Sequence, residues 1–279
     1  MAAWARLSEE EQAEKYKALM EENQVDLIIT MGTAGGLFVK DHTEIPYMNF
    51  LASDPVGSEI VGGAELSGSP RGWAHVSVGI DERALSVMHD IFGPKKIGIV
   101  YNLDDPESYI YSSASSVDAY AKAHGVEVVR RSVSDDIDDS EEMYEAYKAA
   151  MLEAHRELAA EGIDLYILTT SLLMPEDFAP VLEPFVEKGI PVFSVNSTED
   201  VRYGATAAVE MCDYTNIGRF AAEAMRAWKA GEGLEKINQI YDTAPFLVVN
   251  IDTLQRSGIR LSLDVLLSAS EIYGRYAEE

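Results

Sequence analysis

The sequence has little that would support a disulfide, a membrane span or a polyanion-binding surface. Its 279 residues include one cysteine, Cys212, so no disulfide can form within the chain. No run of 18 or more apolar residues is present, which argues against a transmembrane helix. Asp and Glu number 48 against 22 Lys and Arg, which gives a net charge of −26. Because such a surface repels phosphate backbones and anionic headgroups, we expect neither nucleic acid nor membrane surfaces as partners.

Sequence motifs for enzymatic chemistry are also absent. The chain contains no GxGxxG or Walker A loop and no GxSxG nucleophile motif, and the glycine-rich stretch Thr30–Gly36 lacks the lysine of a phosphate loop. The histidines show no metal-ligand spacing such as HxxxH, and we interpret all five as surface or hydrogen-bonded residues: His42, His75, His89, His124 and His155. We therefore expect no cofactor, no metal and no enzymatic activity. An enzyme on an α/β scaffold is the weakest alternative.

Short apolar runs alternate with helical patterns along the chain. Most of the runs are continuously apolar, which is typical of strands buried on both faces of a parallel sheet. We expect strands at 25–30, 45–50, 96–101, 126–129, 164–169, 190–195 and 246–251, and helices at 8–22, 82–92, 108–124, 141–161, 175–188, 216–230 and 262–277. This alternation predicts an α/β fold of parallel sheets flanked by helices.

Three segments depart from this alternation. Residues 53–77 are rich in Gly, Ser and Pro, and residues 197–204 form a polar stretch after an expected strand. Because blocks of similar pattern lie around these two segments, we expect two lobes. The acidic run at 135–142 is interpreted as a solvated loop and helix start, and the alternative of calcium binding lacks the ligand spacing of an EF-hand.

Small polar residues follow the ends of five expected strands. They are Thr33, then Ser53 and Asp54, then Asn102, then Thr170 and Ser171, and finally Ser194 and Asn196. In open α/β sheets, ligands bind outside the carboxyl ends of the strands, where helix N-termini also offer unpaired N–H groups. Any one of these residues is more often a turn or a helix cap, but the repetition predicts a ligand-binding edge.

Several segments occur in an order that resembles a known family. They are VDLIITMGTAGG at 25–36, SDPVG at 53–57, KKIGIVYN at 95–102, IPVF at 190–193, DYTNIG at 213–218, VNIDT at 249–253 and SGI at 257–259. Over roughly residues 10–260 the chain is similar to the substrate-binding proteins of ABC importers, in the branch whose characterised members bind tryptophan or phenylalanine. SDPVG and KKIGIVYN are the most specific of these segments.

The resemblance implies a two-lobed, type I periplasmic-binding fold that encloses its ligand in an interlobe cleft. The implied lobes are 1–79 with 206–240, and 80–205 with 241–279. The loops after the strands would bind a carboxylate and Asp213 an ammonium group, since a buried charge needs a partner. Tyr101 is either a stacking surface for the ligand or part of the strand core. The full set of expected ligand contacts is Thr33, Ser53, Asp54, Tyr101, Asn102, Ser108, Thr170, Ser171, Ser194, Asn196 and Asp213.

The chain departs from the family pattern in three places. Relatives begin with a β-α-β unit that has no counterpart here, so we expect a shortened first lobe. Where relatives often carry Glu-Pro-Asn-Ser, this chain has Asp-Pro-Glu-Ser at 105–108, and the acid at Glu107 opposes a ligand carboxylate unless it turns outward. Leu172 and Leu173 replace more polar residues and favour an apolar ligand side chain.

The residues and the resemblance together predict a solute-binding protein that captures a small amino-acid-like or aromatic ligand for an ABC permease. The runner-up is a cytoplasmic or fused sensor module of the same fold. The first 22 residues lack the basic and apolar regions of a signal peptide, so the protein is cytoplasmic or its sequence begins after an export signal. The resemblance favours an extracytoplasmic location. A homo-oligomer, formed through an exposed sheet edge of the shortened lobe, is a further alternative.

Overall fold

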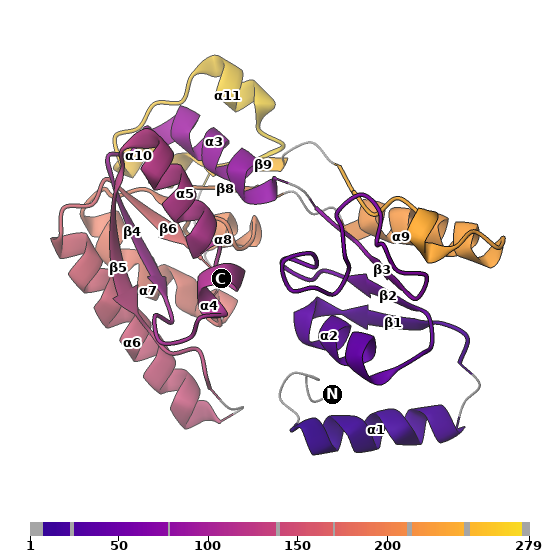
Figure 1. Ribbon diagram of the computed structural model, residues 1–279. Coiled ribbons are helices and arrows are strands. Elements are labelled where there is room, and N and C mark those ends of the chain that lie inside the picture. The colour runs from indigo at the N-terminus through magenta and orange to yellow at the C-terminus, as the bar shows by residue number, and fades with distance from the viewer. Residues whose placement is uncertain are drawn as a thin grey trace. The chain divides into compact units, whose positions relative to one another are not determined.

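The computed structural model describes residues 8–22, 25–77, 79–137, 140–169, 171–210, 214–242 and 246–274. They form two units, each with its own sheet (Figure 1). Each unit also has its own buried core. Unit 1 consists of the described residues of 1–78 and 212–243, and unit 2 of those of 79–211 and 244–279. The expected α/β class, with parallel sheets flanked by helices, is confirmed. Among the described residues, no helix has the length and apolar character needed to cross a membrane.

Unit 1 is built on a three-stranded parallel sheet in the order β1-β2-β3. Its elements are β1 (Ile28–Met31), β2 (Tyr47–Phe50), β3 (Gly72–Ala74), α1 (Glu9–Glu22), α2 (Gly32–His42), α9 (Tyr214–Lys229) and the 3-10 helix η2 (Leu234–Lys236). Successive residues of β2 face opposite sides of the sheet, so Tyr47 packs with α2 and Met48 packs with α9. The segment that returns to unit 1 late in the chain therefore covers one face of its sheet.

Unit 2 contains a seven-stranded sheet in the order β10-β9-β8-β7-β6-β4-β5, parallel except between β8 and β9. The strands are β4 (Lys96–Tyr101), β5 (Glu127–Ser132), β6 (Leu165–Leu168), β7 (Val192–Ser194), β8 (Ala207–Glu210), β9 (Phe246–Asn250) and β10 (Glu271–Tyr273). The helices are α3 (Ile80–Phe92), α4 (Ser108–Tyr111), α5 (Ala114–His124), α6 (Glu141–Ala160), α7 (Pro175–Glu187), α8 (Glu199–Arg202), α10 (Ile251–Arg256) and α11 (Leu263–Ser268).

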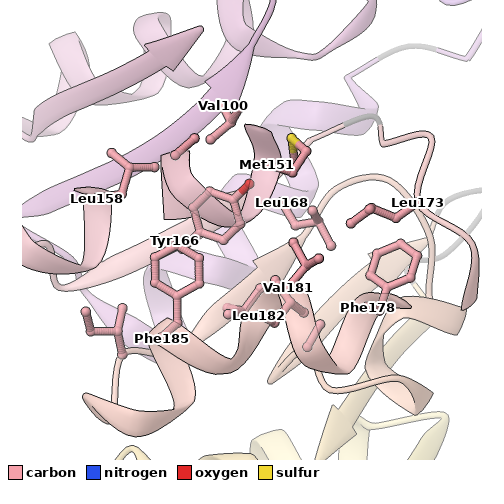
Figure 2. Close-up of a cluster of buried hydrophobic side chains, with 14 of the residues drawn as sticks. Val100, Met151, Leu158, Tyr166, Leu168, Leu173, Phe178, Val181, Leu182 and Phe185 are labelled. Atoms are coloured by element: carbon pink, nitrogen blue, oxygen red, sulfur yellow. The ribbon is translucent and has the colours of Figure 1, made fainter. Parts of the chain in front are cut away.

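The central strands of unit 2 are buried on both faces. On one face Ile97 and Ile99 of β4 pack with α3 and α5, and on the other Val100 packs with α6 and α7. Figure 2 shows the cluster of buried side chains that contains Val100. In this cluster the rings of Tyr166 and Phe185 stack with their centroids 4.4 Å apart. Burial on both faces explains why these strands are continuously apolar in the sequence.

Several expected elements differ in the structure. The expected helix at 108–124 is split into α4 and α5, because Ser113 takes a left-handed conformation with φ 60° between them. The expected helix at 262–277 is wrong at residues 269–274, since residues 271–273 pair with β9 as strand β10. Strands β3 and β8 and helix α2 were not expected. Residues 206–210 were expected in the first lobe, but β8 pairs with β7 and β9 in the sheet of unit 2.

Candidate functional site

The loop after β4 is held together by Asn102. Its backbone N–H donates to Ser108 Oγ at 3.2 Å, and its side-chain amide donates to Asp135 Oδ1 at 3.2 Å. Its own Oδ1 accepts from the backbone N–H of Asp104 at 3.1 Å. Ser108 is buried and begins α4, whereas Glu107 beside it is exposed. The structure thus brings the expected contact residues Asn102 and Ser108 together at the carboxyl end of the sheet.

Acidic side chains dominate the electrostatics of this loop. Tyr111 donates a hydrogen bond to Asp135 Oδ2, and its hydroxyl lies 3.4 Å from Asp105 Oδ2. Burial, and then the hydrogen bond to the Asp135 carboxylate, raise the pKa of Tyr111 well above its usual value. The Tyr111 hydroxyl therefore stays protonated, and the carboxylates of Asp105 and Asp135 both lie beside it.

A small cavity lies behind the same loop. Its volume is about 10 Å³, and its lining includes Asn102, Ser108, Tyr111, Ser112 and Asp135. Ser112 is 2% exposed, and its Oγ has no hydrogen-bond partner among the described residues. The space matches roughly one water molecule, which would satisfy this hydroxyl. The cavity is thus too small to hold the ligand itself.

The loop after β6 meets the same cavity through Tyr147. The Ser171 Oγ accepts from the backbone N–H of Leu173 at 3.2 Å and lies 3.5 Å from the Tyr147 hydroxyl. Tyr147 accepts in turn from the N–H of Leu172 at 3.1 Å and lines the cavity. Ser171 therefore neighbours the Asn102 loop, but its hydroxyl already shapes its own turn.

The end of β7 uses its polar residues to hold a buried acid. Ser194 Oγ donates to Asp200 Oδ2 at 2.5 Å, and the side-chain amide of Asn196 donates to the same oxygen at 3.2 Å. Asp200 is 4% exposed, and burial raises the pKa of its carboxyl while these hydrogen bonds oppose the rise. Ser194 and Asn196 thus stabilise a buried carboxylate within unit 2. The sequence did not predict this role, because Asp200 resembles an ordinary acidic residue in the first turn of a helix.

In unit 1 the expected residues follow β1 and β2. Thr33 lies in the first turn of α2, half-buried, whereas it was expected in a loop. Ser53 and Asp54 are exposed, and Asp54 Oδ1 accepts from the N–H of Gly57 at 2.7 Å, which closes a turn. Asn49 lies near Thr33: its side chain is buried and donates to Gly32 O at 3.0 Å, while its Oδ1 has no partner among the described residues.

Two of the expected contacts, Thr170 and Asp213, lie outside the described residues. Tyr101 ends β4, half-buried against Tyr109 with ring centroids 6.3 Å apart.

The sequence analysis did not predict a role for Asp135, although the acidic run from 135 contained the signal. It also did not predict Ser112, for which no sequence signal exists. The loops of each unit carry hydroxyls, amides and carboxylates, which are groups that bind polar solutes by hydrogen bonds. Within the described ranges, no group of three or more His, Cys, Asp or Glu side chains is arranged to hold a metal ion.

Comparison with known proteins gives a family match over almost the whole chain. Residues 4–273 match the family model described as ABC transporter substrate binding protein. A comparison with curated protein sequences finds no match.

Solved structures with the same fold include three of bacterial origin. A conserved domain protein from Vibrio cholerae has a TM-score of 0.70 at 21% identity, covering 93% of this chain and 82% of that one. An ABC domain in complex with L-Trp from Streptococcus pneumoniae has a TM-score of 0.68 at 15% identity, covering 95% and 86%. The ligand-free, open structure of a substrate-binding protein with adhesive properties from Clostridium difficile has a TM-score of 0.67 at 20% identity, covering 95% and 83%.

Proposed function

The chain belongs to the ABC transporter substrate-binding protein family, and from this premise we propose that it captures a small amino-acid-like solute and delivers it to an ABC permease. The match over residues 4–273 carries the proposal, because it spans both units. An aromatic amino acid is the ligand class we favour, since a protein of the same fold is solved in complex with L-Trp. The proposal includes an extracytoplasmic location and no catalytic step.

In this proposal, each unit contributes polar loops to the ligand. Unit 2 offers the Asn102–Ser108 loop and Ser171, and unit 1 offers Thr33 and the Ser53–Asp54 turn. These groups follow the carboxyl ends of strands, where open α/β sheets bind ligands. Asp213 is the proposed partner of the ligand ammonium, because an ammonium removed from water needs a counter-charge.

A ligand screen followed by calorimetry tests the proposal. We expect at least one aromatic amino acid to raise the unfolding temperature, because a ligand at a hundredfold excess over its Kd stabilises the folded state by about 2.7 kcal/mol. The Asp213→Ala variant should then weaken binding by about 2–5 kcal/mol in isothermal titration calorimetry. Asp90→Ala, which removes an exposed acid of α3, is the matched control and should leave the Kd unchanged.

The outcomes separate two parts of the proposal. If no amino acid raises the unfolding temperature, the ligand class is wrong. If a ligand binds but Asp213→Ala keeps the parent Kd, the ligand class stands and the role assigned to Asp213 is wrong.

A further inference from the structure

Two histidines that are 35 positions apart in the sequence meet on unit 2. His89 lies in the last turn of α3, and His124 is the last residue of α5. Their ring centroids are 4.6 Å apart, and both rings line one groove of about 410 Å³. His124 is exposed and His89 is half-buried, so an ion from solution can reach the two rings.

Tyr120 of α5 orients both imidazole rings. His124 Nδ1 lies 2.9 Å from the carbonyl oxygen of Tyr120, which can only accept, so this nitrogen carries the proton. His89 Nδ1 lies 2.6 Å from the Tyr120 hydroxyl oxygen, and either atom of this pair can be the donor. When His89 donates its Nδ1 proton to Tyr120, both rings keep a lone pair on Nε2, and neither Nε2 has a hydrogen-bond partner among the described residues.

The hydrogen bond from His124 Nδ1 to a carbonyl is typical of metal-bound histidines. A ligating imidazole usually donates its other ring N–H to a carbonyl or another oxygen, which sets the tautomer and the ring orientation. Two imidazoles that share an ion at about 2.1 Å, with an angle of about 90–110° between them, have ring centroids about 4.5–5.3 Å apart. The observed separation of 4.6 Å, with the two ring planes tilted by 39°, is compatible with that range.

We propose that His89 and His124 bind one divalent transition-metal ion through their Nε2 atoms, with water completing the coordination. Imidazole nitrogen selects ions such as Zn²⁺, Ni²⁺ and Cu²⁺ over Mg²⁺ and Ca²⁺, which prefer oxygen. The net charge of −26 raises the local concentration of any cation at the surface. With two protein ligands the site is open, so the ion exchanges with solvent rather than serving as a permanent part of the fold.

Zn²⁺ titration by calorimetry tests the site, with Mg²⁺ as the comparison ion. Because the surface is acidic, Mg²⁺ measures the non-specific attraction of a divalent cation, and we expect Zn²⁺ to bind much more tightly with a stoichiometry near one. His89→Gln and His124→Gln should each reduce Zn²⁺ binding to the level of Mg²⁺. Tyr120→Phe keeps the carbonyl but removes the hydroxyl beside His89, and it should weaken Zn²⁺ binding by about 10-fold to 100-fold.

His42 provides a matched control. It too ends a helix, its Nδ1 lies 2.9 Å from the carbonyl of Phe38 four residues before it, and its ring stacks on Phe38 at 4.3 Å. The structure places no second histidine ring against it within the described residues. His42→Gln should therefore leave Zn²⁺ binding unchanged.

Two outcomes would overturn the site. One is wild-type protein that binds Zn²⁺ no better than Mg²⁺, and the other is Zn²⁺ binding that survives either substitution of the pair. Thermal unfolding without metal, which should be alike in wild type, His124→Gln and His42→Gln, shows that a loss of binding is not a loss of fold. Since the site needs no solute, its failure leaves the proposed transport function untouched.

Discussion

At the residue scale, a buried histidine makes the stability of unit 2 depend on pH. His155 of α6 is fully buried, with Nδ1 2.8 Å from the carbonyl of Val181 and Nε2 2.8 Å from the hydroxyl of Tyr166. The carbonyl can only accept, so Nδ1 carries the proton and Nε2 accepts from Tyr166. Burial lowers the pKa of His155 to about 4, although the hydrogen bond to Val181 opposes the shift.

We expect this histidine to cost stability in mild acid. The unfolded chain binds a proton at His155 near its ordinary pKa of about 6.5, whereas the folded protein does not until the pH reaches about 4. Folding is therefore favoured above the unfolded pKa, and that advantage is lost as the pH falls from about 6.5 to about 4. Between about pH 7 and about pH 5, His155 should remove about 2 kcal/mol from the free energy of unfolding.

Urea denaturation at both pH values measures this effect. His155→Gln should show a smaller pH dependence than wild type by about the same 2 kcal/mol, whatever its stability at neutral pH. His42→Gln, which removes an exposed histidine, should keep the wild-type dependence. Equal pH dependence in His155→Gln and wild type would mean that His155 already takes up its proton in the folded state.

The sequence predicts those site residues whose signal is local, and it does not predict contacts between residues far apart in the chain. Asn102 and Ser108 were expected after a strand and are found there, because strand ends and short polar residues leave a local signal. Asp135, which accepts from Asn102, follows a different strand, so no spacing along the chain links the two residues. His89 and His124 meet for the same reason, since only the packing of α3 beside α5 brings them together. Whether the expected residues contact a ligand stays a prediction.

At the element scale, neighbouring glycines of α2 have opposite roles. A side chain at Gly36 would place its Cβ 2.7 Å from both Asn49 Nδ2 and Ile60 Cδ1, and both of those residues are buried. Asn49 cannot easily move, because its amide is bonded to Thr30 and Gly32. A side chain at Gly35 would meet nothing nearer than 3.5 Å. Close packing of α2 on β2 therefore requires glycine at position 36 but not at position 35.

The two alanine variants should separate these roles. Gly36→Ala should lower the free energy of unfolding of unit 1 by about 1–3 kcal/mol, because overpacking outweighs the better helix propensity of alanine. Gly35→Ala should gain up to about 1 kcal/mol, since it receives the propensity without the clash. Thermal and urea unfolding of both variants measure the difference. Equal effects at the two positions would contradict the packing of α2 shown by the structure.

Some elements of the fold could be predicted from the sequence, and others could not. Strands such as β4 and β6 are buried on both faces and leave continuous apolar runs, so they were predicted and are confirmed. Helix α2 was missed because three of its first five residues are glycine, which disfavours helix in isolation. Strands β3 and β10 have three residues each, and only pairing with a neighbouring strand stabilises them. No local pattern could have predicted these elements.

At the scale of the whole molecule, unit 1 depends on a segment that the chain supplies after completing most of unit 2. Ile217 and Leu234 from this segment pack with Met48 and Trp73 of the sheet in one buried cluster. Gln239, fully buried, links β3 to the segment before it: its Oε1 accepts from Ala74 N at 2.9 Å, and its Nε2 donates to Gly63 O at 2.7 Å. Unit 1 is therefore complete only when residues 214–242 return to it.

Gln239→Ala tests this dependence in the full-length chain. Loss of the side chain leaves the Ala74 N–H and the Gly63 carbonyl without their partner, which should cost about 2–4 kcal/mol. Because the buried clusters of unit 2 contain no residue of this segment, amide hydrogen exchange should quicken in β2 and β3 while β6 and β7 keep their protection.

The neighbouring amide supplies the control for this experiment. Asn238 is exposed, and within the described part of the chain its side chain bonds only to the backbone of Ile240, at 3.0 and 3.2 Å. Asn238→Ala should therefore change stability by less than about 0.5 kcal/mol and leave the exchange of both units unaltered. If Gln239→Ala instead quickens exchange in β6 and β7 as much as in β2 and β3, the two units unfold as one. Their separate cores would then not be separate units of stability.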